Sequence, residues 1–89
     1  MTTASKTSAR ALRPLIQKML DDWCKRHRTT FTLRIEEVLK QYEWTIFIVK
    51  PAKGEVHAYE YASALADVET ELRRKKGVEN VLVLPALPD

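Results

Sequence analysis

Residues 44–85 decide the fold. They begin with three short segments, Trp44-Thr-Ile-Phe-Ile-Val49, Pro51-Ala-Lys-Gly54 and Val56-His-Ala-Tyr-Glu-Tyr61. A stretch of mixed polar and apolar residues follows from Ser63 to Lys76, and then comes Val81-Leu-Val-Leu84. The first and third segments are rich in β-branched and aromatic residues, which favours strands, and the proline and glycine between them favour a turn. After Ser63 the apolar residues switch to helical spacing, and Gly77 is placed to end that helix. The sequence therefore predicts a ββαβ unit.

Two helices are predicted before this unit. The first runs from about residue 9 to residue 28, with Pro14 in its first turn and residues 9–12 as a looser lead-in. The second is predicted over residues 33–42, where apolar residues follow the helical i, i+3, i+4, i+7 template: Ile35, Val38, Leu39 and Tyr42. Residues 30–35 also alternate like a strand, so αβββαβ stays open as the alternative order.

The predicted fold class is therefore α+β, with two N-terminal helices followed by the ββαβ unit and with the helices packed on a small, mostly antiparallel sheet. We expect residues 1–8 to form a flexible N-terminal tail and residues 9–89 to form a single domain. Residues 71–85 resemble the closing helix–strand unit of ferredoxin-like domains, in which a helix ends in Gly-Val and enters a strand. That resemblance implies a packing arrangement and no activity.

Composition narrows the class of protein. The 89 residues are 45 % apolar, which suits a folded chain, and they hold a single cysteine, so no disulfide can form within the chain. No apolar run approaches the roughly 18 residues that span a bilayer. We expect a cytoplasmic protein with no membrane segment.

No combination of residues predicts catalysis or ligand binding. Cys24 and His27 share one side of the first predicted helix, but three-residue helical spacing arises often by chance. The adjacent carboxylates at positions 21–22 and 36–37 point about 100° apart on a helix and do not converge. With only two glycines, the chain has no phosphate-binding loop. We therefore expect no catalytic residue, no metal and no cofactor, and a protein that is not an enzyme.

Two basic runs are candidates for contacts with nucleic acid or with an acidic partner. Both lie at predicted helix C-termini, where cations also stabilise the exposed carbonyl groups without any partner. Together with one further arginine, the candidates are Lys25, Arg26, Arg28, Arg34, Arg73, Arg74, Lys75 and Lys76.

Apolar and aromatic residues suggest an interface instead. In the second predicted strand, three residues share one face: His57, Tyr59 and Tyr61. The final strand is apolar on both faces, so Val81 and Val83 are further candidates, and such a strand at a sheet edge could pair with another chain. Whether the tyrosine side or the side of Trp44 is exposed stays open.

These observations lead us to expect a small non-enzymatic binding module that acts through protein–protein contact, as an adaptor, an inhibitor or a regulatory subunit. Its partner would be another protein or a second copy of the chain. A nucleic-acid-binding accessory protein that uses the basic helix ends is the alternative.

Overall fold

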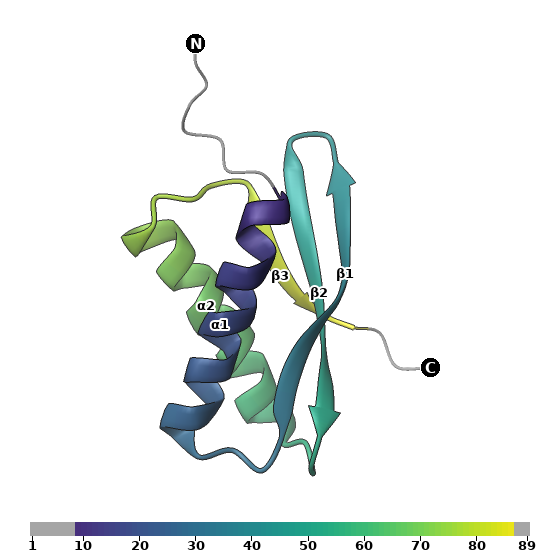
Figure 1. The fold of residues 1–89 in the computed structure, drawn as a ribbon, viewed down its shortest axis with the longest axis vertical. Helices are drawn as coiled ribbons and strands as arrows, with labels where there is room; N and C mark the ends of the chain where they lie inside the picture. Colours follow the sequence, from purple (N-terminus) through teal and green to yellow (C-terminus); the bar gives the residue numbers. More distant parts are fainter. Residues whose placement is uncertain (1–8, 87–89) are drawn as a thin grey trace.

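The chain forms two helices and three strands in the order αββαβ (Figure 1). The computed structural model describes residues 9–86, so the tail predicted at residues 1–8 lies outside the described residues. In chain order the elements are α1 (Ala9–His27), β1 (Thr32–Gln41), β2 (Trp44–Lys53), α2 (Ala58–Lys75) and β3 (Val81–Pro85). The α+β class is confirmed, but between residues 9 and 86 one helix precedes the strands instead of two.

The first helix is confirmed, and it buries one apolar side. Its buried residues recur at helical spacing: Leu12, Ile16, Met19, Leu20, Trp23 and Cys24. The described helix begins at Ala9, so residues 9–12 are helical and do not form a looser lead-in. Pro14 lies inside the helix, where its missing N–H removes one backbone hydrogen bond.

Helix α1 ends on an arginine in the left-handed conformation. Arg28 has φ of 53°, its amide donates to the Lys25 carbonyl at 3.3 Å, and the Thr29 amide donates to the Cys24 carbonyl at 3.1 Å. These two bonds form a Schellman termination, in which glycine is the usual residue at the left-handed position. Arg28 is therefore held in a conformation that a side chain disfavours.

The residues predicted as a helix at 33–42 instead form strand β1. A β-bulge between Ile35 and Glu37 shifts the register of β1 against β2. Before the bulge Leu33 and Ile35 are buried, and after it Val38 packs against the core. The bulge thus turns a two-residue alternation into a helix-like spacing, because one extra residue changes which side chains point inward.

The strand predicted at residues 56–61 is also wrong, because α2 begins at Ala58. His57 is the N-cap residue and makes no side-chain capping bond. Ser63, after which helical spacing was predicted to begin, lies inside the helix. Since residues 32–41 form a strand and 56–61 do not, neither the preferred order nor the αβββαβ alternative is correct.

The hairpin joins β1 to β2 through Tyr42 and Glu43, and not through Pro51-Ala-Lys-Gly54. Gly54 has a different role. A Cβ atom at this position would lie 1.6 Å from the carbonyl oxygen of Thr30, so only glycine lets the end of β2 pass the loop that follows α1.

The helix–strand unit at residues 71–85 is confirmed. Gly77 adopts φ of 65°, and the Val78 amide turns back to donate to the Leu72 carbonyl at 3.0 Å. The chain then enters β3. This strand pairs with β2 in parallel, because α2 carries the chain back along the sheet before β3 begins.

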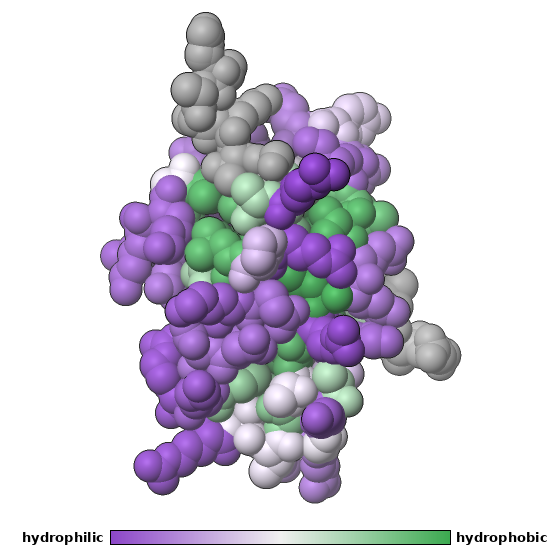
Figure 2. Space-filling model, in the orientation of Figure 1, coloured by the Kyte–Doolittle hydropathy of each residue, from purple (hydrophilic) through white to green (hydrophobic). Residues whose placement is uncertain are grey.

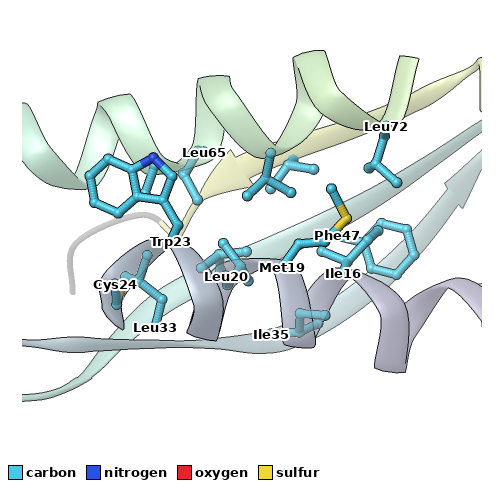
Figure 3. Packing of buried hydrophobic residues seen from close by; sticks show 14 of the residues in the cluster. Ile16, Met19, Leu20, Trp23, Cys24, Leu33, Ile35, Phe47, Leu65 and Leu72 are labelled. Atoms are coloured by element: carbon cyan, nitrogen blue, oxygen red, sulfur yellow. The ribbon is translucent and has the colours of Figure 1, made fainter. Parts of the chain in front are cut away.

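The sheet has the order β1-β2-β3 and is mixed, because β1 is antiparallel to β2 and β3 is parallel to it. Both helices lie on the same side of it (Figure 1). The core fills the space between the helices and the sheet (Figure 3). It joins residues of α1, α2 and the sheet, among them Ile16, Leu20, Trp23, Leu33, Phe47, Leu65 and Leu72.

Candidate functional site

Strand β2 divides its side chains between two surfaces. The side chains that point toward the helices are buried: Thr45, Phe47 and Val49. Those on the opposite side are half-buried or exposed: Trp44, Ile46 and Ile48. Because α1 and α2 pack on the first side, no helix of the described chain covers the second, which we call the helix-free face (Figure 1).

Apolar side chains from all three strands meet on the helix-free face. The register places Ile46 between Leu39 and Leu82, and it pairs Ile48 with Leu84. We call the group the apolar stripe, which consists of Leu39, Trp44, Ile46, Ile48, Leu82 and Leu84. Leu39 and Trp44 are each 41 % exposed, and Leu84 is 37 % exposed.

The apolar stripe is separate from the core. None of its six residues belongs to the buried cluster or to the partly buried residues that pack against that cluster. Figure 2 shows hydrophobic surface beside the hairpin, and hydrophilic surface over the outer side of the helices. A solvated sheet face usually carries polar side chains, whereas a contiguous apolar patch is typical of an interaction surface.

Charged residues border the apolar stripe at one end. Arg34 pairs with Lys50 across the strands, and Glu37 pairs with Ile48. The Lys50 ammonium lies 3.6 Å from the Glu36 carboxylate, and both side chains are about half exposed. Two basic and two acidic side chains therefore leave this border with no net charge.

Side chains of α1 occupy the outer edge of β1 over its first half, at Leu33 and Ile35. Gln17 Nε2 donates to the Leu33 carbonyl at 2.9 Å, and Gln17 Oε1 accepts from the Ile35 amide at 3.0 Å. Arg13 also donates to the Ile35 carbonyl at 3.3 Å. The Gln17 amide thus makes the two hydrogen bonds that a neighbouring strand would make at this point.

The outer edge of β3 is protected as well. The Val83 amide donates to Glu69 Oε1 at 2.9 Å, and Pro85 has no N–H to offer. Val81 and Val83, predicted as interface residues, are buried, because alternate positions of β3 face the core. A chain that paired with β3 at its edge would have to displace Glu69, which makes the predicted edge pairing unfavourable.

The three predicted aromatic and histidine contacts do not form one surface. They lie at the start of α2 and not on a strand: His57 and Tyr59 are exposed, and Tyr61 is half-buried. The Tyr61 hydroxyl donates to the Val49 carbonyl at 2.5 Å and accepts from the Ala86 amide at 3.2 Å, so it joins α2 to the sheet. Burial raises the pKa of Tyr61, the bond from Ala86 opposes that shift, and the charge of Glu36 adds to it.

The two basic runs lie at the C-terminal ends of the two helices. Helices α1 and α2 run antiparallel (Figure 1), and the Trp23 indole donates to Asp67 at 2.8 Å where they cross. Lys25 and Arg26 line a surface hollow together with Glu71, and the Glu71 carboxylate lies 3.9 Å from the Lys75 ammonium, so acidic side chains lie between the two runs. Arg34 is on the helix-free face. The eight basic candidates are exposed but do not make one continuous patch.

Cys24 and His27 do not assemble a reactive site. Cys24 is buried in the core, whereas the His27 ring stacks on the Trp23 ring, with centroids 3.8 Å apart. His27 Nδ1 lies 2.9 Å from the Trp23 carbonyl oxygen, so this nitrogen is engaged with the helix backbone. Over residues 9–86, no group of three or more histidine, cysteine or acidic side chains could hold a metal ion.

A cleft of about 530 Å³ lies beside the hairpin turn, between that turn and the loop from α2 to β3. Its side chains mix both charges, with Lys40 facing Glu43 and Glu79 across an open surface. Thr45 also lines it and is 8 % exposed, and its hydroxyl has no hydrogen-bond partner among the described residues. Because its lining mixes both charges, the cleft favours no particular class of ligand.

The members of the apolar stripe were absent from the predicted contacts. The alternation of Trp44, Ile46 and Ile48 with Thr45, Phe47 and Val49 is the signal that could have found them, because it makes β2 apolar on both sides.

No protein-family model, curated protein or solved structure shows significant similarity to this chain. Neither α1 nor α2 is long and apolar enough to cross a membrane.

Proposed function

We propose that this protein is a non-enzymatic binding module that holds another protein on its helix-free face, as an adaptor, an inhibitor or a regulatory subunit. The observation that carries the proposal is the apolar stripe, which brings six large apolar side chains from three strands to one surface outside the core. Removing apolar area of this kind from water is favourable by about 25 cal/mol per Å², which offsets part of the entropic cost of association.

The form of the surface favours a protein over a nucleic acid. Leucine and isoleucine dominate the apolar stripe, and aliphatic side chains offer no ring for base stacking. The border of the stripe is electrically balanced, and Glu71 lies between the two basic runs, so residues 9–86 do not offer one continuous cationic surface to a phosphate backbone.

The test is a capture experiment from lysate, with and without nuclease, that compares the wild-type chain with two variants. Ile46→Asp places a charge in the middle of the apolar stripe, and Thr70→Asp places one on the exposed side of α2 as a control. We expect proteins that are retained after nuclease treatment, lost with Ile46→Asp and kept with Thr70→Asp. Capture that disappears with nuclease would support the nucleic-acid alternative, and capture that Ile46→Asp leaves unchanged would overturn the proposal.

A further inference from the structure

We infer that the protein which covers the helix-free face is a second copy of this chain, packed sheet against sheet. The inference rests on the proposed function and names its partner. It follows from the state of the sheet edges, from the charge around the apolar stripe and from the order of residues along the strands.

Hydrogen bonds already made at the sheet edges favour association of two copies through the face of the sheet. On β1, Gln17 and Arg13 already bond the outward groups of Leu33 and Ile35. On β3, Glu69 bonds the Val83 amide. Edge-to-edge pairing would break these hydrogen bonds, whereas face-to-face packing leaves all of them intact.

The charge around the apolar stripe permits self-association. The chain carries a formal charge of +3, so most orientations of two copies bring like charges together. The helix-free face differs, because its basic pair Arg34 and Lys50 is balanced by Glu36 and Glu37. A face without net charge neither repels its own copy nor selects a strongly acidic or basic partner.

The order of residues along β2 lets the helix-free face pack against the same face of a second copy. A two-fold axis that lies midway between the two packed sheets, parallel to them and perpendicular to β2, lays Ile46 of one copy over Ile48 of the other. The same operation lays Lys50 over Trp44, since both residues are three positions from Phe47 at the centre. A cation then meets the π face of an indole at both ends of the interface.

The small size of the face favours a weak dimer. All three strands lie side by side over the five paired positions of β2 and β3, and this part of the sheet covers roughly 10 by 16 Å before side chains are added. This is smaller than the roughly 800 Å² per partner of a standard stable interface. We therefore expect a reversible dimer with a dissociation constant of roughly 10 to 100 µM.

Sedimentation of the full chain from about 5 to about 500 µM measures this equilibrium directly. We expect the wild-type chain to dimerise, Ile46→Asp to weaken the dimer at least about tenfold, and Thr70→Asp to leave it unchanged. Backbone amide shifts that change on dilution should belong to residues of the apolar stripe. A pure monomer at the highest concentration, a dimer insensitive to Ile46→Asp, or shifts confined to the helices would each overturn the inference.

A double-mutant cycle tests the two-fold arrangement. Lys50→Met and Trp44→Leu remove the cation and the ring while they keep apolar bulk, and each should weaken the dimer about two- to fivefold. Because both remove the same contact, the double variant should be no weaker than the worse single variant. Additive effects would contradict the predicted pairing of Lys50 with Trp44.

The sedimentation and capture experiments separate the two proposals. A monomeric chain that still captures proteins through Ile46 would leave the proposed function intact and reject only the second copy. A monomeric chain whose capture does not depend on Ile46 would reject both.

Discussion

The same three strands present one apolar surface to two helices and another to solvent. On the covered side Phe47 and Val49 have no exposed area, whereas on the helix-free side the apolar stripe stays partly open. The residue types on the two sides are similar, so hydrophobicity alone does not decide which side is covered. The position of α1 and α2 decides it, and this leaves the second apolar surface available for a partner.

The largest expected effect on stability comes from truncating a buried side chain on the covered side of the sheet, compared with a half-buried one on the helix-free face. Phe47→Ala removes a fully buried ring and should lower the free energy of unfolding by about 3 to 5 kcal/mol, while Ile46→Ala should lower it by less than about 1 kcal/mol. Urea denaturation followed by circular dichroism measures both. Phe47→Leu serves as a milder variant if Phe47→Ala does not fold. Equal losses at positions 46 and 47 would show that the two sides are equally buried.

A smaller effect is expected where α1 closes the edge of β1. Gln17→Ala leaves the Leu33 carbonyl and the Ile35 amide without their partners, and should lower the free energy of unfolding by about 1 to 3 kcal/mol. Hydrogen exchange of the Ile35 amide should become faster. Lys18→Ala is the control, because its ion pair with Asp22 is exposed and should contribute less than about 1 kcal/mol. Unchanged exchange at Ile35 would show that Gln17 does not protect the edge.

The contribution of Tyr61 to the free energy of unfolding should depend on pH. Tyr61→Phe removes two hydrogen bonds and should lower the free energy of unfolding by about 1 kcal/mol near neutral pH. Because the pKa of Tyr61 is raised in the folded state, the wild-type chain should lose stability as the pH rises above the ordinary tyrosine value of 10.0. The variant lacks this contribution, so the difference between the two chains should shrink at high pH. A difference that stays constant from neutral to alkaline pH would contradict the assignment.

The smallest effect belongs to the helix-free face itself. Glu36→Gln breaks the ion pair with Lys50, and should change the free energy of unfolding by less than about 0.5 kcal/mol, because both side chains are about half exposed. Added salt should reduce even this difference. A loss comparable to that of Gln17→Ala would mean that the helix-free face is buried in solution.

The sequence predicted the elements whose apolar residues follow one regular spacing or whose end is marked by a local residue. The stripe of α1 and the stop at Gly77 before β3 are local signals, and the structure confirms both. Strand β1 was missed because its bulge mimics helical spacing around Val38. The start of α2 was missed because Tyr59 and Tyr61 alternate with polar residues as in a strand.

The candidate site was less accessible to prediction. Leu39 joins the apolar stripe only because the bulge returns it to the helix-free side, and a bulge of this kind leaves no mark in composition. For Ile46 and Ile48 the alternation was visible, but the exposed side depends on where the helices pack. That arrangement is a property of the whole chain.

The mixed sheet also sets an order of events during folding. The antiparallel hairpin of β1 and β2 joins neighbours in the sequence, so it closes a short loop, whereas the parallel pairing of β2 with β3 must wait for α2 to form and dock. We therefore expect β3 to be the last strand to attach and the first to detach. A chain whose synthesis has not yet reached Val81 would leave the inner edge of β2 unpaired, and that intermediate would be the form most prone to aggregate.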